Sequence, residues 1–198
     1  IVEGAVEYAR GFSETSGIIF DKGVYLAGST YWVPRFEASE MSSFELTVKI
    51  DEDWAVVSQG KRVRNELVGN KMTIKYESPE PMDEIYLIAA KWTEYSEQFE
   101  NVLVQAFLRT PDEALAQRYI KVTADYIRLY QDLLGDYPYT KFALVENFWE
   151  TGYGMPSFPL LGEKVIRFPW ILHSSYPHEL LHNYWGNSVF VDYETGNW

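Results

Sequence analysis

Two histidines and a glutamate fall within five consecutive residues near the end of the sequence, His178-Glu179-Leu180-Leu181-His182. In a helix, side chains four residues apart lie on one face, so both imidazoles can reach a single metal ion. Glu179 can hold a zinc-bound water without ligating the metal and accept its proton as the water attacks a carbonyl. The spacing therefore predicts His178 and His182 as zinc ligands and Glu179 as a general base.

Chance pairing of two histidines on one turn is the plain alternative to a metal site. The chain has only 3 His, however, and two of them fall in this segment. The third, His173, lies upstream of His178 on the far side of Pro177, and we do not expect it to be a ligand. Because a catalytic zinc takes three protein ligands and keeps one position open, a third ligand must be sought.

Two sources of the third ligand follow from known spacings. The metzincin pattern needs a Gly at position 185 and a His at position 188, and the chain has Trp185 and Ser188 there, which excludes it. The other source is a Glu on a following helix, as in thermolysin-like enzymes. The acidic residues after His182 are Asp192 and Glu194, both close enough to be turn residues before such a helix.

The element before this segment is predicted to be a long helix that begins near residue 110. A capping Thr110, then Pro111 at the first helical position and Glu113 three residues on, is typical of a helix start. Gly135 supplies the terminator. Between them, apolar residues recur at steps of three and four: Leu115, Tyr119, Val122, Tyr126, Leu129 and Leu133. We place the domain boundary here, giving domains 1–109 and 110–198.

The first half is predicted to consist of strands and turns. Residues 44–50 alternate between apolar and polar side chains, as in a half-buried strand. Further short strands are expected at 54–57, 71–76, 84–89 and 102–108, with turns at Gly69-Asn70 and Ser78-Pro79. An antiparallel sheet or sandwich follows. After the helix come an apolar strand at 142–145, a Gly- and Pro-rich stretch at 151–162 and a short strand near 165–168.

The composition is that of a soluble globular protein. Hydrophobic residues make up 46% of the 198 residues and charged residues 23%, and the 17% aromatic content favours a β-rich core. A net charge of -12 without a Lys or Arg cluster argues against nucleic acid as a partner. The chain has no Cys, so a zinc site must use His and carboxylate ligands.

No apolar run reaches the roughly 18 residues that a transmembrane helix needs, and no signal segment opens the chain. The sequence begins at Ile1, which indicates a cleaved precursor or a piece of a longer protein. The compartment stays open between the cytoplasm and export after removal of a signal.

Residues 177–187 (PHELLHNYWGN) resemble the zinc aminopeptidase family that includes aminopeptidase N and the leukotriene A hydrolases, a gluzincin family, and the Gly186-Asn187 pair is a strong marker of it. In that family the third ligand is a Glu three positions after a Trp. Trp198 occupies the Trp position, so the resemblance places the ligand at position 201, beyond the end of this chain. It implies one zinc per complete protein, and weak or absent zinc and no activity in this chain alone, which needs the rest of the parent chain.

Two other stretches resemble the same family. Residues 135–139 with Lys141 are similar to the segment leading into its first catalytic-domain strand, and residues 23–29 with 32–34 to the end of its amino-terminal β domain. The resemblance implies an α+β fold: part of an antiparallel β domain, a sandwich or saddle, followed by the start of a thermolysin-like α/β catalytic domain.

The family's substrate loop, Gly-x-Met-Glu-Asn, is altered in this sequence. It reads GYGMPS over residues 152–157, so that Pro156 replaces the Glu that holds the free amino terminus of a substrate. The resemblance implies substrate binding by Tyr153, Gly154, Met155 and Pro156. Glu146 or Glu150 are candidates to replace the lost Glu. Residues 158–161 are expected to form the edge strand on which peptides dock.

Three functional hypotheses follow. The first is zinc-dependent hydrolysis of peptide bonds, aminopeptidase-like, with Glu179 as the base. The second, motivated by Pro156, is a catalytically weak or inactive relative that binds peptides in the same cleft. The third is a structural β module with an accidental motif, which predicts no zinc.

Overall fold

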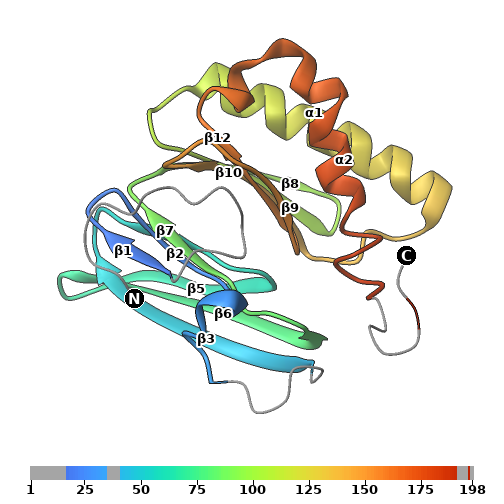
Figure 1. The fold of residues 1–198 in the computed structure, drawn as a ribbon. Helices are drawn as coiled ribbons and strands as arrows, with labels where there is room; N and C mark the ends of the chain where they lie inside the picture. The colour runs from blue at the N-terminus through green and yellow to red at the C-terminus, as the bar shows by residue number, and fades with distance from the viewer. Residues whose placement is uncertain (1–16, 35–40, 191–195, 197–198) are drawn as a thin grey trace. The chain divides into compact units, whose positions relative to one another are not determined.

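The computed structural model describes residues 17–34, 41–190 and 196. The chain divides into two compact units, residues 1–92 and 93–198 (Figure 1). This division falls earlier than the boundary expected near residue 110. The reason is that strands β8 (Thr93–Phe99) and β9 (Val102–Leu108) join the sheet of the second unit, where β9 pairs in parallel with β10 (Lys141–Asn147).

A three-stranded antiparallel sheet forms part of the first unit. Its order is β3 (Ser42–Asp51), β6 (Lys71–Met82) and β5 (Lys61–Val68), and the expected turn at Gly69-Asn70 joins β5 to β6. Every second residue of β3 from 44 to 50 is half-buried, which confirms the alternation. The strand β5 was not predicted, because nearly all of its side chains are exposed and it lacks a buried face.

Four short strands form the second sheet of this unit. Their order is β1 (Ile18–Phe20), β2 (Gly23–Leu26), β7 (Leu87–Ala90) and β4 (Ala55–Val57), all antiparallel. One buried cluster draws side chains from both sheets, for example Val56 from this sheet and Tyr76 from the other, and the Tyr76 hydroxyl donates to the Val56 carbonyl at 2.9 Å. The unit is therefore a sandwich of two sheets, as expected.

The turn predicted at Ser78-Pro79 is wrong, because both residues lie within β6. The pairing of β3 with β6 is irregular here, between Ser42 and Phe44. A proline lacks the backbone N–H that a regular ladder uses, so an interrupted stretch of the ladder tolerates Pro79.

The second unit is built on a mixed five-stranded sheet. The order is β11 (Gly152–Met155), β12 (Phe158–Gly162), β10, β9 and β8, with β9, β10 and β12 parallel and the two outer strands antiparallel. The helices α1 (Glu113–Leu134) and α2 (Ser175–Leu181) both lie on one side of this sheet (Figure 1). The helix α1 makes the crossover between the parallel strands β9 and β10.

The predicted helix exists, with a different cap. Its N-cap is Asp112, whose carboxylate accepts from the Leu115 amide at 2.9 Å, so Thr110 and Pro111 lie outside the helix. Gly135 ends the helix with φ 99°, as predicted. The predicted apolar stripe holds only in the first half, because Leu129 and Leu133 are exposed, and the buried residues are Leu115, Ala116, Tyr119, Ile120, Thr123 and Ile127.

Two short 3-10 helices precede α2: η3 (Val165–Arg167) and η4 (Pro169–His173). The strand expected near 165–168 is therefore wrong. The short apolar run has no strand partner and instead buries Ile166, whose carbonyl accepts from the Tyr119 hydroxyl of α1 at 2.8 Å. Within the described ranges, no helix has both the length and the apolar character needed to cross a membrane.

Candidate metal centre

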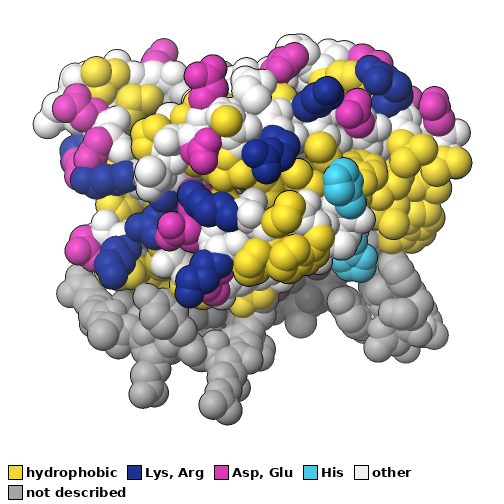
Figure 2. Space-filling model, turned by 90° about the horizontal axis from the view of Figure 1, so that it is seen from above, with side chains coloured by type: hydrophobic (Ala, Val, Ile, Leu, Met, Phe, Trp, Pro, Cys, Tyr) yellow, Lys and Arg dark blue, Asp and Glu magenta, His cyan; other side chains and the backbone are white. Residues whose placement is uncertain are grey.

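The segment that carries the histidines forms the helix α2 and the turn after it. Its buried residues are Tyr176, Pro177 and Leu180, which face the sheet and α1. Pro177 lies in the first turn, where a backbone N–H has no partner within the helix to lose. Burial of this face leaves His178 on the exposed side of α2. On the face shown in Figure 2, histidine side chains (cyan) lie beside hydrophobic side chains (yellow).

The two imidazoles converge at their Nε2 atoms. His178 Nε2 and His182 Nε2 are 3.0 Å apart, and the His182 amide donates to the His178 carbonyl at 3.1 Å, which continues the helical backbone. Two nitrogens on one tetrahedral zinc, each about 2.05 Å from the metal, are roughly 3.3 Å apart. The pair thus matches the donor type and the separation that zinc requires of two ligands.

The outer nitrogen of His182 also has a contact. Nδ1 lies 3.4 Å from the Trp185 carbonyl oxygen. A carbonyl only accepts, so this contact calls for a proton on Nδ1 and leaves the Nε2 lone pair for the site. Backbone carbonyls commonly orient metal-binding histidines in this way.

The Glu179 carboxylate lies against the strand β11. A Cβ added at Gly154 would overlap Glu179 Oε2, so the absence of a side chain at this position gives the carboxylate its place. Glu179 is half-buried, and burial raises the pKa of its carboxyl, an effect that His182 and His178 oppose. The structure therefore brings together the three residues that the sequence singled out.

A third ligand is not found among the residues that the structure describes. Within 17–34, 41–190 and 196, no group of three or more His, Cys, Asp or Glu side chains could hold a metal. The candidates Asp192 and Glu194, and Trp198, lie outside the described residues. His173 is exposed at the end of η4.

The altered loop forms a tight hairpin between β11 and β12. Met155 pairs with Phe158, which leaves Pro156 and Ser157 as the turn. Tyr153 and Gly154 are half-buried, whereas Met155 and Pro156 are buried. The edge strand is β11, so the expectation that residues 158–161 would form the edge is wrong: β12 is flanked by β11 and β10.

Both carboxylates considered as substitutes for the lost Glu serve the local structure. Glu146 is 1% exposed and accepts from the Arg109 amide at 2.7 Å and from Arg167 Nη1 at 2.8 Å. Glu150 accepts from the Lys164 amide at 3.1 Å. Neither residue joins the histidines in a described cluster of possible metal ligands.

Sequence reasoning missed how the hairpin is fastened to the histidine segment. The Asn187 side chain donates to the Gly154 carbonyl at 3.3 Å, and the Asn187 backbone carbonyl accepts from the Tyr139 hydroxyl. Asn183 accepts from the Ser157 amide at 2.6 Å. The feature that points to this contact is the burial of the polar Asn183, which is 0% exposed. Burial of a single polar side chain cannot be read from the sequence, so no sequence signal was available.

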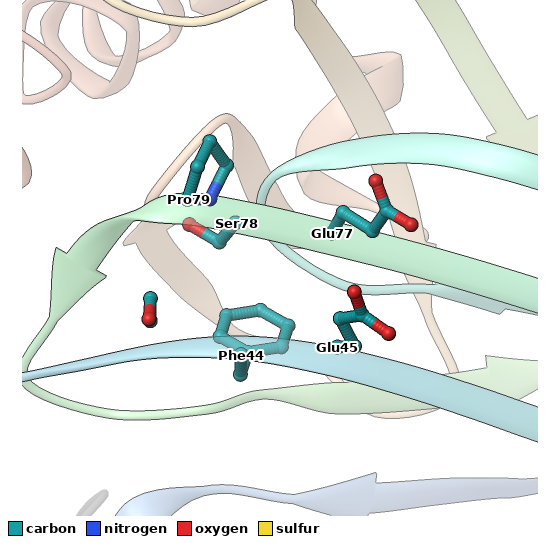
Figure 3. Close-up of a pocket in the computed structure, with 6 residues that line it drawn as sticks. Phe44, Glu45, Glu77, Ser78 and Pro79 are labelled. Atoms are coloured by element: carbon teal, nitrogen blue, oxygen red, sulfur yellow. The ribbon is translucent and has the colours of Figure 1, made fainter.

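A separate hollow of about 300 Å³ lies in the first unit, between β3 and β6 (Figure 3). Its two carboxylates, Glu45 and Glu77, lie 3.0 Å and 2.6 Å from Lys75 Nζ. Hydrogen bonds to Glu77 and then Glu45 raise the pKa of Lys75. This ion pairing satisfies the acidic side chains, and the hollow holds none of the predicted site residues.

The architecture defines the class: an α+β protein with a β-sandwich unit and an α/β unit bearing an HExxH helix. No protein-family model and no curated protein sequence matches the chain.

Solved structures share the fold. An M1 zinc metallopeptidase from Deinococcus radiodurans matches with a TM-score of 0.59 and 15% identity, over 83% of this chain and 40% of its own. A mutant of the M1 enzyme from the same organism matches with 0.59 and 13%, over 83% and 40%.

A two-domain M1 zinc metallopeptidase mutant bound to L-arginine matches with a TM-score of 0.62 and 12% identity, over 85% of this chain and 41% of that chain. The chain thus spans about 40% of the length of these structures. At such identities the likeness establishes the fold.

Proposed function

We propose that this chain carries the metal-binding and proton-accepting part of a zinc-dependent peptidase of the aminopeptidase type. The main support is the convergence of His178 and His182 at a 3.0 Å Nε2 separation, with the Glu179 carboxylate on the adjacent helical position. The shared fold with M1 zinc metallopeptidases supports it independently.

His178 and His182 would hold the metal, and a Glu at position 201 would complete the protein ligands, with one zinc per complete protein. When bound, zinc would polarise the scissile carbonyl and lower the pKa of the attacking water. The residues that the structure describes supply two of these ligands, and under this proposal the Glu at position 201 would supply the third.

Glu179 would accept the proton of the attacking water at its carboxylate. A general base must reach the proton that it abstracts and should not itself be a metal ligand. Its position beside two imidazoles and against β11 suits this role, because a substrate on β11 would have its backbone near the carboxylate.

The peptide substrate would bind along β11, the outer strand of its sheet. An extended peptide can add to such an edge through backbone hydrogen bonds. Tyr153 and Gly154 are half-buried on this strand and would contact the substrate, whereas the buried Met155 and Pro156 would shape the hairpin from within.

A second candidate function is peptide binding with weak or no hydrolysis. It is favoured by Pro156, which is buried at the position where the resembling family has its amino-terminus-binding Glu. Zinc bound without cleavage of any peptide in a panel would support this function over the first.

The test is peptide hydrolysis by the complete protein, including position 201, with and without Glu179→Gln. We expect the substitution to abolish turnover while zinc content stays at one per protein, because Glu179 is not a ligand. Glu97→Gln, an exposed position of β8, is the matched control and should leave turnover unchanged. Equal turnover of the Glu179→Gln and unmodified proteins would overturn the proposal.

A further inference from the structure

Three buried polar side chains connect the central sheet to the histidine segment. Lys141 on β10 is 2% exposed, and Ser157 in the hairpin turn and Asn183 after α2 are both 0% exposed. Buried polar groups are costly unless they are hydrogen-bonded, so an apolar core would be the simpler way to hold these elements together.

The first link joins β10 to the hairpin. Lys141 Nζ donates to Ser157 Oγ at 2.6 Å and lies 5.3 Å from the centre of the Phe158 ring. The Ser157 carbonyl accepts from the Ala143 amide of β10 at 3.1 Å. The turn of the β11–β12 hairpin is thereby fixed to the strand β10 through both its side chain and its backbone.

The second link joins the hairpin to α2. The Ser157 amide donates to Asn183 Oδ1 at 2.6 Å. Asn183 Nδ2 donates in turn to the carbonyls of Glu179 at 3.2 Å and Leu180 at 3.1 Å. These carbonyls belong to the last turn of α2, and the Leu180 carbonyl also accepts from the Asn183 amide at 3.1 Å.

The backbone at Ser157 is strained. Its φ is 68°, in the left-handed region, where glycine would be less strained. A serine at this position costs stability relative to glycine, and its hydroxyl is the group that Lys141 contacts. The hairpin so fixed also presents Gly154, against which the Glu179 carboxylate lies.

We propose that Lys141, Ser157 and Asn183 are positioning residues that fix α2 against the edge hairpin, so that the Glu179 carboxylate stays beside β11. The inference rests on the proposed peptidase function. None of the three residues touches the expected zinc or substrate; each acts through the placement of Glu179.

The test compares Asn183→Asp, Ser157→Ala and Ser157→Gly in the complete protein. Asn183→Asp retains an acceptor for the Ser157 amide and loses both donors to α2. Ser157→Gly removes the hydroxyl while relieving the left-handed strain, so it separates positioning from stability. We expect kcat to fall by about 10- to 100-fold in each, with KM changed less than about threefold.

Gln105→Met is the matched control. Gln105 is 1% exposed on β9, where it pairs with Ala143 of β10, and its side chain donates to Glu94 at 2.7 Å and not to any of the three positioning residues. We expect it to lower the thermal midpoint and leave kcat unchanged. Zinc content is the readout independent of turnover, and it should stay at one per protein in Asn183→Asp and in Gln105→Met, because the Glu179 carboxylate that the three residues position is not a ligand.

The outcomes separate the two proposals. If kcat falls only in the variants whose thermal midpoint falls, and Ser157→Gly is fully active, the positioning role is overturned. The proposed peptidase function is then unaffected. If the unmodified protein neither binds zinc nor cleaves peptides, both fall together. A Ser157→Ala/Asn183→Asp double variant no slower than the slower single variant would support one connected network.

Discussion

Gly154 on the edge strand β11 leaves the space that the Glu179 carboxylate of the HExxH segment occupies. Any side chain at this position would collide with that carboxylate. The relationship joins an edge strand to a helix across more than twenty residues of sequence, and it makes this strand glycine part of the proposed active site.

Gly154→Ala should therefore displace Glu179 and lower kcat by about 10- to 100-fold in the complete protein, because small misplacements of a catalytic group are costly. Gly152→Ala on the same strand is the control, since an added Cβ there meets nothing within 4 Å. Steady-state kinetics of both variants, with zinc content, provide the measurement. Full activity of Gly154→Ala would show that catalysis does not require the Glu179 carboxylate to lie against Gly154.

Tight zinc binding should require His178, His182 and a ligand from the complete protein. We expect this 198-residue chain to bind zinc more than about 100-fold more weakly than the complete protein, because loss of a direct ligand exceeds typical outer-shell effects. In the complete protein, His178→Ala or His182→Ala should abolish stoichiometric zinc, and His173→Ala should not. Metal analysis after dialysis decides, and tight one-to-one zinc in the 198-residue chain would contradict the expectation.

The cap of α1 can be tested by stability. Asp112→Ala should lower the free energy of unfolding by about 1 kcal/mol, because the Leu115 amide loses its acceptor. Thr110→Ala should have little effect, since Thr110 is exposed and is not the cap. Urea denaturation of the two variants compares them directly. A larger loss of unfolding free energy in Thr110→Ala would show that Thr110 is the N-cap, as expected from the sequence.

Stability should fall in alkaline solution. Burial raises the pKa of Tyr176, an effect that the Thr123 hydroxyl 2.6 Å away opposes. An unfolded tyrosine loses its proton near pH 10 while the folded one keeps it, so this contribution is complete below pH 10 and is lost as the pH rises. The loss is about 1.4 kcal/mol per pH unit for each such tyrosine.

Urea unfolding at a series of pH values from about 9 to 12 measures this slope. Tyr176→Phe should reduce the slope of unfolding free energy against pH by the contribution of one tyrosine, about 1.4 kcal/mol per pH unit. The Thr123 hydroxyl keeps its bond to the Tyr119 carbonyl at 2.7 Å in that variant, so no buried donor is orphaned. An unchanged slope would show that Tyr176 ionises equally in both states.

The sequence by itself determined the features that depend on neighbours along the chain. The His178 to His182 spacing places both imidazoles on one helical face whatever else the protein does. In the same way, alternation over 44–50 gave a half-buried strand, and Gly135 ended α1.

Only the tertiary structure decided which strand is at the edge, where the compact units divide, and what Glu146 and Ser157 do. Each depends on pairing between segments far apart in the chain: β9 joins β10, β11 flanks β12, and Asn183 meets the hairpin turn. Periodicity reports whether a side chain faces a core, and it carries no information about which distant backbone lies opposite. For that reason the convergence of His178 and His182 could be predicted from the sequence, whereas the contact between the Glu179 carboxylate and Gly154 could not.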